Sequence, residues 1–163
     1  MALKTKILGR EALTKKLNEI APSVEKYAAP AKLEIAEEAA DKIAGRAPTG
    51  ATLEYMHNIE AGRLADHPDK KPVGINASKD PSAAGVFAPF IWRFLEFGTA
   101  PHNTAPGGGT VLGQVTHAEG GGTQHPGTAA QPHIFPTWRE MRDRAKRKIQ
   151  AAVNKGVKEA MSK

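Results

Sequence analysis

The segment PTWREMRDRAKRKIQAAVNKGVKEAM, residues 136–161, decides how the rest of the chain has to be arranged. Its apolar residues, from Trp138 to Ala160, return at three- and four-residue steps, as they do on one face of an α-helix. Arginines and lysines fill most of the remaining positions. Pro136 suits the first turn, where a helix needs no amide donor. We therefore predict a basic amphipathic helix over residues 136–161, with an apolar face that needs a partner.

A second helical region is predicted at the other end of the chain, where residues 9–46 repeat apolar side chains at helical spacing. Pro22 and Pro30 interrupt this pattern, and each lacks an amide proton and clashes with the preceding turn. We expect two helices or one bent helix. The turn at 47–50 (Ala-Pro-Thr-Gly) ends the helical region.

Between the helices, residues 50–99 carry short mixed segments. Thr52–Ile59 and Pro72–Ala77 are bounded by Gly, Pro and Asp, which is typical of strands in an antiparallel sheet. Four of the chain's nine aromatic side chains lie in Ala88–Thr99, with Phe87 just before it, and we interpret this string as a core or interface anchor. The order predicts a single α+β domain over residues 1–163, whose two helical regions pack on a small antiparallel sheet.

Residues 101–132 differ from the rest of the chain. They hold eight glycines and four prolines, and Glu119 is their single charged residue apart from histidines. Such a composition cannot offset its ordering entropy by burial, and a loop of this length is usually a binding element or disordered alone. We expect a loop that orders against neighbouring subunits.

The charge of the 163-residue chain is +6, and residues 136–163 account for it with nine basic against three acidic side chains. Such a block attracts phosphate backbones or an acidic protein surface, although a solvated helix face has the same composition. The chain has no cysteine, no apolar run long enough to span a membrane and no signal-peptide pattern. Synthesis in the cytoplasm fits this composition best.

The sequence offers little for catalysis. The serines lie outside a nucleophile elbow, the glycine runs lack a phosphate-binding ending, and four histidines near the loop lack a metal-binding spacing. Glu96 is the carboxylate that we expect to be partly buried, paired with Arg93 or with a base from another chain. We predict no catalytic residue, no cofactor and no metal site.

Three strings in order form a recognisable pattern: the Pro48-Thr49-Gly50 turn, the string from Phe94 to Thr99 (FLEFGT), and the string from Gln131 to Pro136 (QPHIFP). With them the chain resembles the gene-product-ten-like neck proteins of long-tailed bacteriophages of the HK-ninety-seven type and their prophage and gene-transfer relatives. The likeness runs from about Leu33 to Ala160. His133 departs from it, since a phenylalanine is common there, and the 101–130 loop is longer than expected.

The resemblance implies a non-enzymatic virion protein at the head–tail junction, in a six-fold or twelve-fold ring that completes the tail or joins it to the head. Its partners would be copies of itself, head-closure or tail-terminator and tail-tube proteins, and DNA in the lumen, with no membrane. The alternative is a nucleic-acid-binding protein that acts through its basic helix. The predicted interface residues are Phe90, Trp92, Phe94, Glu96, Phe97, Gly98 and Thr99 as a scaffold, Gly107, Gly108, Gly109, Gly120, Gly121, Gly122 and Gly127 as a docking arm, and Arg142, Arg144, Arg147 and Lys148 as an electrostatic face.

Overall fold

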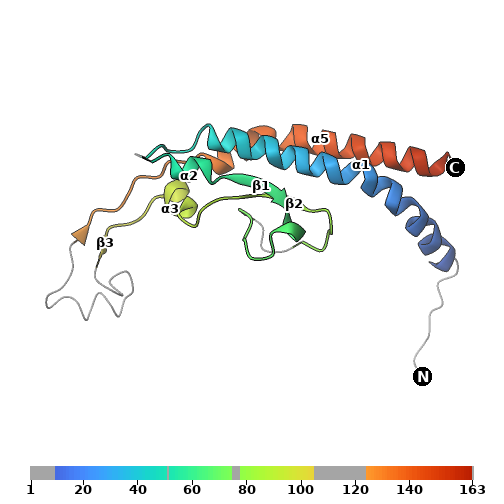
Figure 1. Cartoon of the computed structure of the whole chain (residues 1–163), viewed down its shortest axis with the longest axis horizontal. Helices are drawn as coiled ribbons and strands as arrows, with labels where there is room; N and C mark the ends of the chain where they lie inside the picture. Colours follow the sequence, from blue (N-terminus) through green and yellow to red (C-terminus); the bar gives the residue numbers. More distant parts are fainter. Residues whose placement is uncertain (1–9, 51, 75–77, 105–123, 163) are drawn as a thin grey trace, which may run out of the picture.

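The protein is described by a computed structural model that covers residues 10–50, 52–74, 78–104 and 124–162. It is an α+β fold, as predicted, with two long helices above a layer of short elements (Figure 1). The elements in chain order are α1 (Arg10–Ala44), α2 (Glu54–His57), β1 (Glu60–Arg63), a 3-10 turn (Leu64–Asp66), β2 (Ala84–Phe87), α3 (Trp92–Phe97), β3 (His102–Asn103), β4 (Gln124–His125) and α5 (Ile134–Met161).

The two long helices lie side by side and antiparallel (Figure 1) and pack mainly against each other. We expected both helices to pack on the sheet, but the main helix contacts of β1 and β2 are with α1. Gly156 near the end of α5 faces the backbone of Val24 in α1. Ion pairs line the seam, since Arg144 and Lys148 of α5 pair with Glu38 and Glu34 of α1. Two of the four cations that we assigned to an electrostatic face therefore hold the helices of the chain together.

Helix α1 is continuous from Arg10 to Ala44 although Pro22 and Pro30 lie inside it. Of the two predicted arrangements, the bent single helix is the correct one. Its first turns bend away from α5 (Figure 1), as expected of a helix whose proline removes an amide donor and crowds the preceding turn. The bend leaves the start of α1 without cover from α5, and Leu13 and Leu17 are 60% and 56% exposed.

The strands are not where the sequence pattern placed them. Within 52–59 the chain forms the short helix α2 instead of a strand, and the strand follows it as β1. β1 pairs antiparallel with β2, in a register that runs from Glu60 opposite Phe87 to Arg63 opposite Ala84. In the second predicted strand, Val73 donates one amide hydrogen bond to Val86 and belongs to no strand, and 75–77 lie outside the described residues. Segments of four residues are too short for a period to separate strand from turn.

The main apolar core lies where α1, the start of α5 and the layer beneath them meet. Its buried members come from α1, from the turns after α1 and α2, and from α5: Ala39, Ala40, Ile43, Ala47, Ile59, Ile134 and Met141. No described helix has a stretch long and apolar enough to cross a membrane. The core therefore joins the beginning of α5 to the end of α1, and it fixes the position of the segment that leads into α5.

Candidate assembly site

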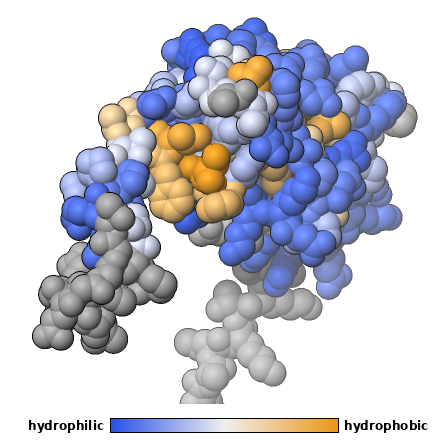
Figure 2. Space-filling view, turned by 60° about the vertical axis from the view of Figure 1, so that its left-hand side comes forward, coloured by the Kyte–Doolittle hydropathy of each residue, from blue (hydrophilic) through white to orange (hydrophobic). Residues whose placement is uncertain are grey.

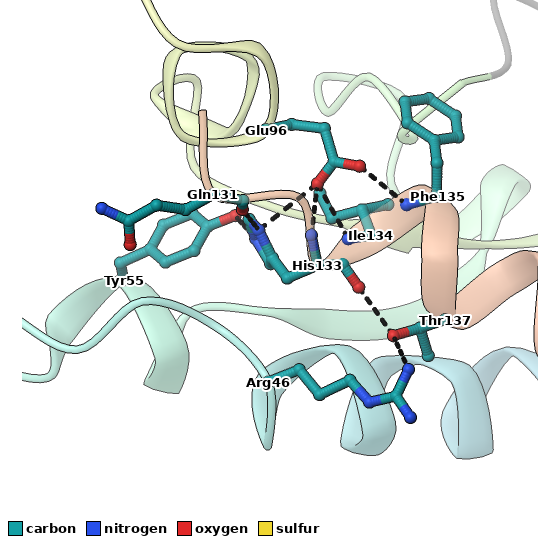
Figure 3. Close-up of polar contacts among 8 residues, drawn as sticks. All are labelled: Arg46, Tyr55, Glu96, Gln131, His133, Ile134, Phe135 and Thr137. Carbon is teal, nitrogen blue, oxygen red and sulfur yellow. Dashed lines mark hydrogen bonds and ion pairs between the residues drawn. The ribbon is translucent and has the colours of Figure 1, made fainter. Parts of the chain in front are cut away.

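A buried carboxylate joins two of the three strings on which the resemblance rests. Glu96, in α3, is 2% exposed, and its Oε2 accepts hydrogen bonds from the amides of His133 (2.8 Å) and Ile134 (2.9 Å). Its Oε1 accepts a third from the amide of Phe135 at 3.0 Å (Figure 3). The next residue, Pro136, has no amide to satisfy. The free donors at the start of α5 are thus all accounted for by one side chain from a distant element.

This arrangement corrects two predictions. Glu96 does not pair with Arg93, whose guanidinium lies 5.3 Å from the ring centre of Trp92. Helix α5 also starts at Ile134, two residues before the predicted start at Pro136. His133 stands at the N-cap without making a side-chain cap of its own, so the helix takes its cap from Glu96. The positive end of the helix dipole favours the same negative charge.

The carboxylate stays ionised in this setting. Burial raises the pKa of Glu96, but hydrogen bonds from the amides of His133, Ile134 and Phe135 outweigh burial and hold that pKa below its usual range. A charge that is paired and fully hydrogen-bonded can be buried at a tolerable cost. The site therefore uses Glu96 as a fixed structural anion.

His133 is buried beside this carboxylate, between two further partners. Its Nδ1 lies 2.8 Å from the carbonyl oxygen of Gln131 and 3.3 Å from Oε2 of Glu96. Because both neighbours of Nδ1 are acceptors, we assign the proton to Nδ1. Nε2 then accepts the hydrogen bond from the hydroxyl of Tyr55, 2.7 Å away. Burial, together with the charge of Glu96, raises the pKa of Tyr55 to about 12.

A second chain of hydrogen bonds connects this junction to α1. The hydroxyl of Thr137 donates to the carbonyl of His133 at 2.6 Å and accepts from the guanidinium of Arg46 at 3.2 Å (Figure 3). Arg46 also forms an ion pair with Glu140 at 2.7 Å. The start of α5 is thereby tied to α3 on one side and to the end of α1 on the other.

Replacement of Tyr55 by phenylalanine is expected to lower the free energy of unfolding by about 1–2 kcal/mol, because Nε2 of the buried His133 loses its donor. Urea unfolding followed by circular dichroism measures this change. Phe94→Leu, at a half-exposed position of α3, is the control and should cost less. An unchanged unfolding midpoint in Tyr55→Phe would show that water replaces the hydroxyl without loss.

The aromatic string next to this junction faces outward. Phe90 is 79% exposed, Phe97 64% and Phe94 52%, so these three rings do not anchor the core. Trp92, the fourth aromatic residue of the string, is partly buried and packs against that core. The rings of Phe97 and Phe135 have centres 5.8 Å apart, and Trp92 lies 6.2 Å from Phe135. Hydrophobic residues gather at this end of the molecule, beside the segment that leads to β3 and β4 (Figure 2). We call Phe90, Trp92, Phe94, Phe97 and Phe135 the aromatic patch.

Gly98 and Thr99, predicted in the same scaffold, serve the fold of their own chain. Thr99 exchanges backbone hydrogen bonds with Thr128, at 2.9 and 3.1 Å. Gly98 has φ of 72°, and a Cβ there would lie 2.5 Å from the carbonyl oxygen of Thr128. Only glycine fits both the backbone angle and this close approach. These residues hold the end of α3 against the segment that returns toward α5.

The predicted docking arm lies largely outside the described residues. Gly107, Gly108, Gly109, Gly120, Gly121 and Gly122 all belong to 105–123. The described ends of this segment pair as β3 and β4, with His102 opposite His125. Gly127, just after β4, has φ of 87° and approaches the carbonyl of Thr99. The base of the predicted arm is thus a short antiparallel ladder.

The remaining predicted cations lie on the outer side of α5. Arg142 and Arg147 are exposed, and within the described part of the chain Arg147 forms no ion pair. Arg139 and Lys146 share this outer surface. The described residues contain no group of three or more His, Asp or Glu side chains arranged to hold a metal ion. This outer side of α5 is the part of the predicted electrostatic face that remains available to a partner.

The chain matches none of the protein-family models, curated proteins or solved structures with which it was compared. The junction itself was only partly visible to sequence reasoning. The residues it missed are Tyr55, His133 and Thr137. A usable signal was present, because the residues at the start of this helix, His-Ile-Phe-Pro at 133–136, include none of the usual N-capping side chains, so the helix needs an acceptor from elsewhere.

Proposed function

We propose that the protein is a non-enzymatic assembly component of the bacteriophage head–tail neck, which forms a ring that completes the tail or joins it to the head. The aromatic patch is the observation that carries this proposal. Phe90, Phe94 and Phe97 expose large apolar rings on one end of the molecule, and exposed apolar surface of this kind marks interaction sites. Tyrosine, tryptophan and phenylalanine are also enriched in the buried cores of protein interfaces.

The junction beneath the patch supports the same role. Glu96 links the FLEFGT string to the QPHIFP string through hydrogen bonds to the start of α5. Two of the three strings that carry the resemblance to neck proteins are therefore joined by hydrogen bonds in one unit, although Glu96 and His133 are 37 positions apart in the sequence. A surface held on such a unit needs little ordering when a partner binds, which favours affinity.

The proposal is tested by adding the protein back to a phage from which its gene has been deleted. Phe90→Gln with Phe94→Gln should leave the free energy of unfolding within about 0.5 kcal/mol of the wild type, since both rings are at least half exposed. Particles made with this variant should accumulate as full heads beside separate tails in negative-stain microscopy.

Met161→Gln is the matched control, because it also exchanges an apolar for a polar side chain at a position 76% exposed. It should support normal joining. Complete particles formed in the absence of the gene would overturn the proposed function. Normal joining by the double phenylalanine variant would overturn the role of the patch.

The second candidate is nucleic-acid binding through the outer side of α5. Exposed Arg139, Arg142, Lys146 and Arg147 favour it, because cations at successive turns of one helix can follow a phosphate backbone. Arg144 and Lys148 form ion pairs with Glu38 and Glu34, so the outer side of α5 offers fewer unpaired cations to a phosphate backbone than the sequence suggested. Binding to double-stranded DNA that falls steeply with salt, in the absence of any particle, would favour this function.

A further inference from the structure

An apolar stripe at the start of α1 continues the seam between the two long helices beyond the point where α5 covers it. Leu13, Leu17 and Ile20 follow the same three- and four-residue steps that lead on to Val24 and Tyr27. Val24 contacts Gly156, and the hydroxyl of Tyr27 donates to Glu159, so these two residues are held against α5. We call Leu13, Leu17 and Ile20 the leucine stripe.

Among the described residues, nothing covers Leu13 and Leu17 of the leucine stripe in this way. Leu13 is 60% exposed and Leu17 56%, and the first turns of α1 bend away from α5 (Figure 1). Helical turns that pack against nothing are marginal in water. A stripe that is apolar in register with a packed seam, yet open to water, is typical of a helix face whose partner is another molecule.

A concave apolar surface exists further along the same helices. This groove encloses about 550 Å³ between the middle of α1, strand β2 and the first half of α5. Its apolar lining includes Ile35, Val73, Val86, Phe135, Trp138 and Ile149. Trp138 is 40% exposed, although the helical pattern placed it on the apolar face. We call this hollow the α1–α5 groove.

The stripe and the groove cannot meet within one chain. Eighteen residues of continuous helix separate Leu17 from Ile35, which is about 27 Å at 1.5 Å per residue. Within the described residues neither surface fills the other, so each is open to a second molecule. One is a convex ridge, the other is a hollow, and both are apolar, so a second copy of this chain offers the complement to each.

We propose that the leucine stripe of one copy packs into the α1–α5 groove of a second copy. The two surfaces differ, so the contact is heterologous: each copy uses its stripe on one neighbour and its groove on the other. Each added copy can repeat this contact with the next copy. The copies form a closed ring when the rotation that relates neighbouring copies is a whole-number fraction of 360°. The closure into a ring rests on the proposed function, whereas the contact itself is a property of the purified chain.

Sedimentation of the purified full chain over a concentration series tests the contact. The wild type should form assemblies larger than a dimer. Leu13→Gln with Leu17→Gln should weaken self-association by about 100-fold or more, because two buried leucine side chains are lost from each contact. The fold should be unaffected, since both side chains are exposed in the single chain. Glu11→Gln with Lys15→Gln, on the opposite side of the same turns, is the matched control and should assemble as the wild type does.

The groove is tested by Trp138→Glu and, should that variant fold poorly, by Ala83→Glu, since both residues line it. Either should also be monomeric. A mixture of the two kinds of variant then tests whether the stripe of one copy binds the groove of another. The stripe variant keeps an intact groove and the groove variant keeps an intact stripe, so the mixture should give a 1:1 heterodimer and nothing larger. Raising the salt should leave the heterodimer intact, because the contact is apolar.

Three results would overturn the inference: a wild-type chain that is monomeric at every concentration, a groove variant that still dimerises through its stripe, or a mixture without heterodimer. These outcomes are separate from the fate of the proposed function. Self-association through these surfaces in a protein that never enters a virion would remove the neck role alone. Normal particles containing Leu13→Gln with Leu17→Gln would remove the stripe contact alone.

Discussion

Replacement of Glu96 by alanine is expected to lower the free energy of unfolding by about 3 kcal/mol or more, the largest loss from any single polar side chain in this structure. Three amides at the start of α5 donate to this carboxylate. Each buried donor left without an acceptor costs about 1–3 kcal/mol, and the helix also loses a negative charge at its positive end. Urea unfolding followed by circular dichroism measures the loss.

Glu96→Gln separates the charge from the shape of the side chain. The amide keeps one acceptor oxygen but turns a donor toward one of the backbone amides, so this variant should also be destabilised at neutral pH. Because the folded chain holds the pKa of Glu96 below its usual range, the ionised form contributes stability. That contribution is complete above the unfolded pKa of about 4.3 and is lost as the pH falls through the folded pKa.

The difference in the free energy of unfolding between the wild type and Glu96→Gln should therefore shrink as the pH is lowered through the pKa of Glu96 in the folded chain. Glu37→Gln, at an exposed position of α1, is the control and should track the wild type closely. A gap that stays constant down to the lowest pH at which both proteins fold would show that the charge of Glu96 contributes nothing.

Replacement of Gly156 by leucine should separate the ends of the two long helices and cost about 3 kcal/mol or more. Even a Cβ at this position would lie 2.5 Å from Cα of Val24 and 2.6 Å from the carbonyl oxygen of Ser23. Both atoms belong to the backbone, so no side-chain rotation can make room. A glycine inside a helix costs about 1 kcal/mol relative to alanine, and this close approach is the physical reason for its presence.

Asn154→Leu is the matched control, because it introduces the same side chain two residues earlier at an exposed position of α5. It should leave the free energy of unfolding within about 0.5 kcal/mol of the wild type. Urea unfolding of both variants, with sedimentation to exclude aggregation, measures the difference. Equal midpoints for Gly156→Leu and Asn154→Leu would mean that α1 moves away from α5 and accommodates the larger residue.

The long elements were predictable because many residues repeat one period. Helix α1 and helix α5 were both expected within two residues of their observed limits, and the α+β class followed from their order. The short elements were not. β1 and β2 have four residues each, and β3 and β4 have two, so backbone pairing in three dimensions, and not side-chain pattern, selects them.

Local sequence determined where the two long helices lie, because the spacing of apolar residues and the chemistry of proline are properties of neighbours along the chain. It also fixed the charge of α5. Only the three-dimensional packing decided that Glu96 caps the start of a helix 37 positions further along the chain. It also decided that Arg144 and Lys148 form ion pairs with α1 and that three phenylalanines remain exposed. Those outcomes depend on which groups far apart in the sequence come within a few ångströms of one another. The local sequence pattern does not specify these distances.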